Sequence, residues 1–397
     1  MAAKGLNVNM DLERVNRLKD YVQGVLDNEE GRALYIKYKE YIDKVTPQEC
    51  FEIFTSKLEK GYTPKDVLKI LDKVINVFYK PLSNYSWERP KEGSFLDLLM
   101  KENKALEKKL GEIRRIIQNK EVEEKKDELL ERVKELEEFN EHYLKKENIL
   151  FPYMEKKMDR FKGLTIMWSL HDEARESIKK VINILESEDM SLDEFNYEIG
   201  KLFFTLLGIV KKEDLILFPA AMEVISDGEW EEMNFQSIEY GFPFIKRPAL
   251  EEKEELNLYG FEDRKFKTDT GELNFEQLLL LLNTLPVDLT FVDENNKVKF
   301  FTRPKDRIFP RSPAVIGRDV ENCHPAESVY LVNKIIESFR NGSQDSAKFW
   351  IDYKGRKILI QYFALRNSRG EYKGVLEVSQ DVTETKGLRG EKRLLGW

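Results

Sequence analysis

The sequence contains few of the side chains that usually carry catalysis or bind metals. Its 397 residues include 3 histidines, His142, His171 and His324, and 2 cysteines, Cys50 and Cys323. Any mechanism that needs several more imidazoles is excluded by number alone. Two cysteines so far apart in the sequence cannot build a disulfide framework, and they suit a reducing compartment. We therefore expect a cytoplasmic protein.

Other absences exclude further classes of protein. No apolar run reaches the roughly 18 residues that a transmembrane helix needs, and Met1 to Arg14 lack a secretory core. The net charge of -8 does not favour nucleic-acid binding. The sequence has no phosphate-binding loop and too few histidines for Ser-His-Asp or Cys-His chemistry. We predict no catalytic residues, and a regulatory protein is favoured over an enzyme.

The chain is long enough for two or three domains, each with its own core. Hydrophobic residues make up 41% and charged residues 35%, which describes a folded protein with a heavily charged surface. Composition and turn signals divide the chain into an N-terminal helical domain, a four-helix bundle, a linker, an α+β domain and a tail. Their predicted ranges are 1–86, 92–231, 232–272, 273–386 and 387–397.

The N-terminal domain reads as short helices. Thr46-Pro47 and Thr63-Pro64 are N-cap signals, because each proline is followed two residues later by an acid at the third helical position. Residues 66–79 then carry apolar side chains on one helical face.

Four long helices are predicted for the middle of the chain, over 95–118, 122–151, 165–187 and 191–217. Their short polar connections favour an antiparallel, up-down bundle. Two of them close on related motifs, Glu147-Asn-Ile-Leu-Phe-Pro and Asp214-Leu-Ile-Leu-Phe-Pro. Each motif places an acid three residues before Leu-Phe-Pro, and we expect each proline to end its helix.

The C-terminal domain changes to alternating, β-branched segments. A hairpin at 285–301 is followed by a helix at 328–340 and by strands at 347–353, 356–366 and 372–381, with Gly355 and Gly370 in the turns. Helices against an antiparallel sheet make this an α+β domain.

These segments resemble known families. The C-terminal order of elements, closed by Gln380-Asp-Val-Thr-Glu, resembles a PAS domain. The motifs starting at His142, Met167 and Lys211 resemble hemerythrin-like HHE bundles, and residues before them resemble the domain-of-unknown-function 438 family. The resemblance implies a cytosolic sensory protein with a non-haem iron site. Three positions depart from the family pattern: Asp97 stands where relatives often have histidine, Ile209 stands where an HxxxE pair would begin, and Lys146 stands four residues after His142 in place of an acid. A full oxygen-carrying di-iron site therefore cannot be assembled.

Helical angles predict which polar side chains face the bundle interior, since a helix turns about 100° per residue. Glu102, Glu147 and Asp214 fall on apolar stripes, and His171 and Glu213 lie at stripe edges. His142 is expected to the side, nearer the surface. The candidate metal ligands are Glu102, His142, Glu147, His171, Glu213 and Asp214.

Two interpretations of these acids remain open. Carboxylates around an imidazole are costly to bury without compensation, and a resident iron or manganese ion would compensate them. Alternatively, the acids contact water at a bundle end or pair with the cations Lys145, Lys146, Lys211 or Arg175.

The PAS-like domain offers a second candidate site. A cavity between sheet and helices would hold an unknown small ligand, lined by Phe291, Phe300, Tyr330, Phe339, Trp350 and Phe363. The alternative is that these rings form plain core. His324 is a candidate haem ligand, or else a residue that leads into the helix after Pro325.

The leading functional hypothesis is a sensor. A redox change, a gas or a metal would act on the bundle or the PAS cavity and change a contact with a protein partner, with a homodimer through the PAS domain implied by resemblance. The alternatives are an iron or manganese protein acting on oxygen, nitric oxide or iron itself, and a scaffold whose metal site is degenerate.

Overall fold

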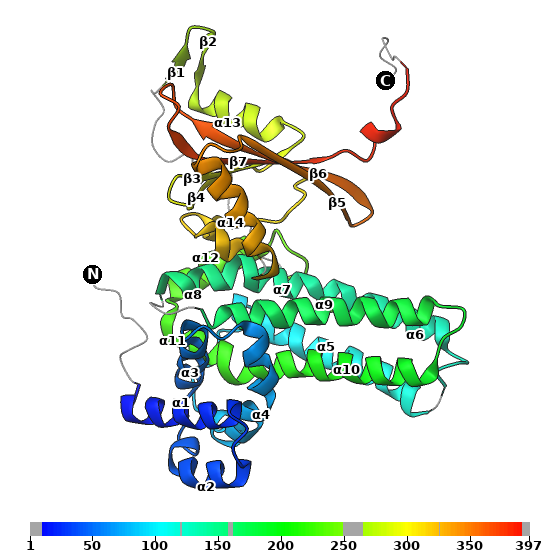
Figure 1. Cartoon of the computed structure of the whole chain (residues 1–397). Helices are drawn as coiled ribbons and strands as arrows, with labels where there is room; N and C mark the ends of the chain where they lie inside the picture. The colour runs from blue at the N-terminus through cyan, green and yellow to red at the C-terminus, as the bar shows by residue number, and fades with distance from the viewer. Residues whose placement is uncertain (1–9, 120, 158–161, 249–264, 325, 391–397) are drawn as a thin grey trace. The chain divides into compact units, whose positions relative to one another are not determined.

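The computed structural model describes residues 10–119, 121–157, 162–248, 265–324 and 326–390 (Figure 1). The chain forms two compact units, Met1–Glu251 and Glu252–Trp397. The first unit is helical, and the second contains a five-stranded antiparallel sheet, which confirms the predicted fold class. Within the described ranges, no helix combines the length and the apolar character needed to cross a bilayer.

The helical unit begins with four helices: α1 (Leu12–Leu26), α2 (Gly31–Ile42), α3 (Pro47–Glu59) and α4 (Pro64–Ser83). The predicted N-caps are confirmed. Thr46 and Thr63 each form a reciprocal capping box with the acid three residues on, Glu49 and Asp66. These caps satisfy backbone N–H groups that a helix start leaves without partners.

The first helices pack directly on the bundle. Lys212 of the last long helix forms an ion pair with Asp72 of α4, at 2.6 Å between Nζ and Oδ1. The Gly163 backbone N–H donates to the Thr55 hydroxyl of α3 over 3.1 Å. Residues 1–86 and 92–231 thus belong to one compact unit, and a domain boundary between them stays a prediction.

The bundle is built from α5 to α12. Their bounds are α5 (Phe95–Gln118), α6 (Lys126–Glu135), α7 (Asn140–Lys145), α8 (Phe151–Lys157), α9 (Leu164–Glu186), α10 (Leu192–Lys212), α11 (Phe218–Val224) and α12 (Asp227–Ser237). Three joints interrupt the second and fourth rods: a 3₁₀ turn, η2 (Leu136–Phe139), and two π-helical turns, η3 (Lys146–Leu150) and η4 (Glu213–Leu217).

The expectation that Pro152 and Pro219 end their helices is wrong. Each lies in the first turn of a further helix, α8 or α11, directly after a π-helical turn. Proline is tolerated there because a first-turn residue needs no intrahelical N–H bond. The wide turn therefore lets each rod continue past its Leu-Phe-Pro motif.

The second unit contains a five-stranded sheet, a separate two-stranded hairpin and two α-helices. The strand order is β4 (Val298–Phe301), β3 (Asp288–Asp293), β7 (Tyr372–Asp381), β6 (Arg356–Arg366) and β5 (Ser346–Tyr353). Helix α14 (Ala326–Arg340) packs on one face through Ile336 and Phe339, against Val292 and Val375. Helix α13 (Phe275–Thr284) lies on the opposite side of the sheet (Figure 1).

Two predicted segments fall partly outside the described residues. At the C-terminal end of the predicted linker, β1 (Lys265–Thr268) and β2 (Gly271–Asn274) form an antiparallel hairpin that continues past residue 272, while 249–264 are not described. Of the predicted tail, residues 391–397 are not described. The predicted boundaries of linker and tail therefore stay predictions.

The six aromatic residues predicted to line one cavity do not all lie together. Phe339 is buried in the core under α14, whereas Tyr330 and Trp350 are exposed. Phe300, Phe291 and Phe363 form one cross-strand row, since each aligns with a residue of that row. Their row faces away from the core because the alternate residues Val292 and Val375 point into it. Of the six, only Phe339 belongs to the core cluster under α14.

Candidate functional site

Three predicted side chains meet in the middle of the bundle. His142 of α7 lies between Glu102 of α5 and Glu213, the first residue of η4. Its Nδ1 is 2.8 Å from Glu102 Oε2, and its Nε2 is 3.1 Å from Glu213 Oε2. All three side chains are fully buried. The Asn103 amide adds a hydrogen bond to Glu213 Oε2 over 2.9 Å.

Glu213 points into the bundle, whereas Asp214, which was predicted to point inward, is on the surface. The buried stripe of α10 runs through Leu202, Leu206 and Ile209, and Glu213 continues it four residues on. Asp214 is exposed. The predicted stripe was displaced because this helix also carries apolar residues on its other faces, so the pattern did not identify the buried one.

His142 was expected at the surface and is instead fully buried. The neighbouring residues Tyr143, Lys145, Lys146 and Glu147 of the same rod are buried as well, so this part of the rod is enclosed on more than one face. A single apolar stripe therefore does not mark its interior, and His142 lies inside although it is off that stripe.

Two buried lysines complete this group. The Lys145 ammonium forms an ion pair with Glu102, and the Lys146 ammonium forms an ion pair with Glu213. Both lysine side chains are almost completely removed from solvent. The predicted alternative partner Lys211 points elsewhere and donates to Asn76.

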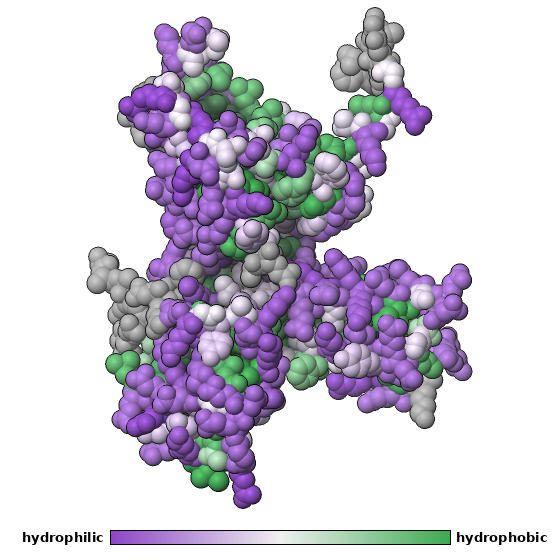
Figure 2. All heavy atoms as spheres, in the orientation of Figure 1, coloured by the Kyte–Doolittle hydropathy of each residue, from purple (hydrophilic) through white to green (hydrophobic). Residues whose placement is uncertain are grey.

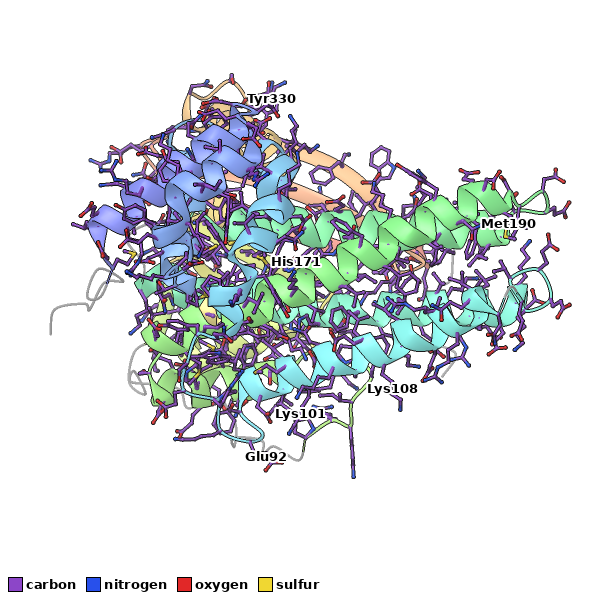
Figure 3. The ribbon with its side chains drawn as sticks, turned by 90° about the horizontal axis from the view of Figure 1, so that it is seen from below. Glu92, Lys101, Lys108, His171, Met190 and Tyr330 are labelled. Atoms are coloured by element: carbon purple, nitrogen blue, oxygen red, sulfur yellow. The ribbon has the colours of Figure 1, made fainter. Side chains whose placement is uncertain are left out.

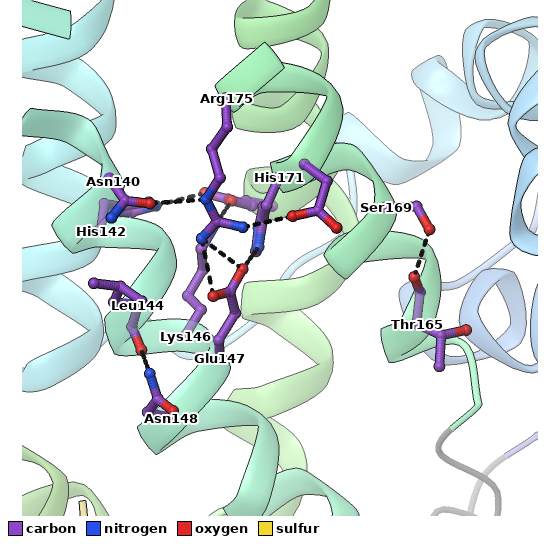
Figure 4. Close-up of polar contacts among 12 residues, drawn as sticks. Asn140, His142, Leu144, Lys146, Glu147, Asn148, Thr165, Ser169, His171 and Arg175 are labelled. Atoms are coloured by element: carbon purple, nitrogen blue, oxygen red, sulfur yellow. Dashed lines mark hydrogen bonds and ion pairs between the residues drawn. The ribbon is translucent and has the colours of Figure 1, made fainter. Parts of the chain in front are cut away.

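A second group lies beside the first, between η3 and α9 (Figure 4). Glu147 accepts two hydrogen bonds from Arg175, of 2.9 and 3.0 Å, and lies 2.8 Å from His171 Nδ1. Arg175 is further held by Asn140 and Asp172. Figure 3 shows His171 within the bundle. Glu147 and His171 are thus buried together, as predicted.

Burial sets the protonation of these groups. Desolvation raises the pKa of Glu102 to about 7 against the opposing effect of Lys145, and raises the pKa of Glu147 to about 7 against that of Arg175. Burial also lowers the pKa of Lys146 and of both bundle histidines, His142 and His171. Each buried Lys–Glu pair is neutral overall, which limits the cost of burying its two charged groups.

A few buried polar atoms have no hydrogen-bond partner in the described part of the chain. They include His171 Nε2, the Tyr143 hydroxyl and Asn103 Oδ1. The Tyr143 and His171 rings stack, with centroids 4.4 Å apart and planes inclined by 15°. Tyr143 thus packs against one of the buried histidines.

The side chains as arranged do not fit a metal centre. Among the described residues, no group of three or more His, Cys, Asp or Glu side chains is placed to hold an ion. The carboxyl groups of Glu102, Glu147 and Glu213 are each engaged by a cationic side chain. A second cation at these oxygens would have to displace an ammonium or a guanidinium group. Sequence reasoning considered these cations but missed Asn103, whose only signal is its position beside Glu102.

The second candidate site, around His324, lies at the end of a 3₁₀ turn (Val320–Cys323). Burial lowers the pKa of His324, and Arg311 and Glu377 are close enough to affect it. Arg311 and Glu377 form an ion pair of 3.1 Å. The role of His324 as a haem ligand stays a prediction.

Comparison with known families finds one matching domain family in each unit. Residues 94–221 match the hemerythrin HHE cation binding domain. Residues 278–383 match a PAS domain. Both predicted resemblances are confirmed, and together they indicate a sensory or regulatory role. The resemblance of residues 1–86 to the domain-of-unknown-function 438 family stays a prediction.

Solved structures with similarity to the chain include a C-terminal domain from Streptococcus mutans, at 31% identity over 32% of this chain and 100% of that one, with a TM-score of 0.31. A PAS domain from Colwellia psychrerythraea is 14% identical over 28% of this chain and 97% of its own, with a TM-score of 0.23. A sensory box sensor histidine kinase from Vibrio cholerae is 18% identical over 27% and 92%, with a TM-score of 0.21. No curated protein matches the chain.

Proposed function

We propose that this chain, which carries a hemerythrin HHE domain followed by a PAS domain, is a cytoplasmic sensor that signals through a protein–protein contact. A redox change, a gas or a metal acts on the bundle or the PAS unit and alters that contact. The combination of the two domains supports the sensory role. The single observation that supports the contact is the exposed apolar surface of α13.

Helix α13 has no buried side chain, although residues 278–282 are five leucines in a row. Leu280 is 59% exposed and Leu281 55% exposed. Figure 2 shows hydrophobic atoms at the surface where α13 lies. Contiguous apolar surface of this kind usually marks an interaction site. We name Phe275, Leu280, Leu281 and Leu285 the α13 surface.

We propose that the α13 surface contacts a second copy of this chain. A two-fold dimer brings the same patch of both partners together, so the patch must be complementary to itself in shape and charge. Glu276 is the one charged residue in the sequence of α13, so little like-charge repulsion opposes such pairing. The hydrophobic effect then favours burial of the exposed leucines against their equivalents.

Light scattering coupled to gel filtration tests this proposal. The wild-type chain is expected to form a dimer, and Leu280→Glu/Leu281→Glu is expected to be monomeric with unchanged circular dichroism. Leu331→Glu, on α14 and 49% exposed, is the matched control and should remain dimeric. Repeating the measurement with dithionite, nitric oxide or ferrous iron identifies the signal. A wild-type monomer under all these conditions would contradict the proposed contact.

The alternative of an oxygen, nitric oxide or iron-handling protein requires a resident metal in the bundle. The paired carboxyl groups do not favour it. The alternative of a scaffold with a degenerate metal site agrees with those pairs but assigns no role to a signal. A change in dimer dissociation with one of the three reagents separates a sensor from a scaffold.

A further inference from the structure

We infer that the bundle keeps its buried carboxyl groups without a resident metal ion, with Lys146 occupying the place of a ligand, and that removal of Lys146 converts the same centre into a site for a divalent cation. This inference concerns the chemistry of the bundle. It does not depend on the dimer contact proposed for α13.

Ion pairs account for every predicted acidic ligand that the structure buries. Lys145 pairs with Glu102, Lys146 with Glu213, and Arg175 with Glu147. A buried carboxylate is tolerated only when a cation or hydrogen-bond donors compensate it. Here side chains of this chain provide that compensation, so the centre does not require an ion for its stability.

The internal repeat shows why Lys146 is the important residue. The two π-helical turns, η3 and η4, begin at Lys146 and Glu213, and each of these residues lies three positions before the same Ile-Leu-Phe-Pro sequence. Lys146 and Glu213 are therefore equivalent positions of the two halves, and they contact each other. One half places a carboxylate at this position, and the other half places its counter-ion.

The groups around Lys146 are the donors that manganese, iron and cobalt accept. Glu213 contacts Lys146 and His142 directly. His171 has a buried Nε2 without a hydrogen-bond partner in the described structure, and Lys146 is close enough to lower the pKa of this imidazole, after the larger effect of burial. Without the ammonium group, the Glu213 carboxylate loses its counter-ion. The His142 ring still contacts this carboxylate, and His171 keeps a buried Nε2 that has no partner among the described residues. That donor set suits a first-row divalent ion.

The test compares the wild-type chain with Lys146→Met, in which an apolar side chain of similar length replaces the ammonium group. Wild-type protein from iron-replete medium should hold well under one equivalent of iron or manganese, and EDTA should leave its Tm unchanged. Lys146→Met should gain Co²⁺-dependent stability, with a rise in Tm of about 5–10 °C at a concentration about 100 times Kd. A Co²⁺ absorption band should appear in parallel.

Two further variants serve as controls. Lys146→Met/Glu213→Gln removes both charges of the pair and should fold without gaining Co²⁺ affinity. Lys108→Met, at an exposed lysine on α5 that projects away from the bundle (Figure 3), should behave as wild type. One or more equivalents of tightly held metal in the wild type would overturn the inference. A folded Lys146→Met protein that does not bind Co²⁺ would also overturn it. If this variant does not fold, the metal content of the wild-type protein decides whether the inference holds.

Discussion

Substitution of Arg175 by methionine should destabilise the helical unit strongly. Arg175 donates two hydrogen bonds to the buried Glu147 and also contacts Asn140 and Asp172. The variant leaves Glu147 in the interior with His171 but without its cation. Removing one partner of a buried ion pair typically costs about 3–5 kcal/mol, because an uncompensated charge remains.

The exposure of the two side chains narrows the expected loss of stability. The Arg175 side chain is 25% exposed and that of Glu147 is 2% exposed, so water reaches the guanidinium more readily than the carboxylate. We therefore expect a loss near the lower limit, about 3 kcal/mol. For a unit of this size that corresponds to a fall in Tm of about 6–12 °C. Arg175→Met/Glu147→Gln, which removes both charges, should recover most of the loss.

Urea unfolding followed by far-UV circular dichroism measures these differences. Arg132→Met is the matched control, since Arg132 pairs with Glu112 and Glu128 at the surface of the same bundle. An exposed pair contributes at most about 1 kcal/mol. The reasoning would be refuted if Arg175→Met cost no more than Arg132→Met, or if the double variant were as unstable as the single one.

Three other substitutions test separate parts of the structure. Burial lowers the pKa of Lys57 from 10.5 to about 8, so between these pH values the folded chain binds fewer protons than the unfolded chain. The free energy of unfolding should therefore rise by roughly 2 kcal/mol from pH 8 to pH 10. Urea titrations at the two pH values should show that Lys57→Met abolishes this rise. Gly374 has φ +131, and an added Cβ would lie 2.1 Å from the Val292 carbonyl oxygen, so Gly374→Ala should destabilise the PAS unit by at least about 2 kcal/mol, measured by hydrogen exchange of its strands. Thr46→Ala removes the cap shared with Glu49 and should cost about 1 kcal/mol by thermal unfolding, whereas Thr46→Ser should cost little.

The local patterns in the sequence determined much of the fold. The last two strands of the PAS unit have the predicted bounds, 356–366 and 372–381, because alternation and a glycine turn are properties of neighbouring residues. The first bundle helix also has its predicted bounds, 95–118, since its N-cap and apolar period are equally local. The identities of both families follow from motifs of the same kind.

Which side chains share the bundle centre was only partly predictable. Glu102 and Glu147 lie on apolar stripes and His171 lies at a stripe edge, and all three are buried as predicted. His142 and Asp214 were misplaced, the first to the surface and the second to the interior. Both residues belong to rods that are buried or apolar on more than one face, so no single stripe marks the interior. Packing against the other rods decides which face meets the polar centre, and no window of neighbouring residues contains that information.

The sequence by itself determined the composition of this protein's polar centre: few histidines, several acids and the lysines beside them. Only the tertiary structure decided which cation pairs with which acid, because the partners come from different helices. Glu102 and Lys145 are 43 residues apart, and Lys146 and Glu213 are 67 apart. Charge compensation in a low-dielectric interior depends on distances of a few ångströms, and folding alone brings such distant residues that close.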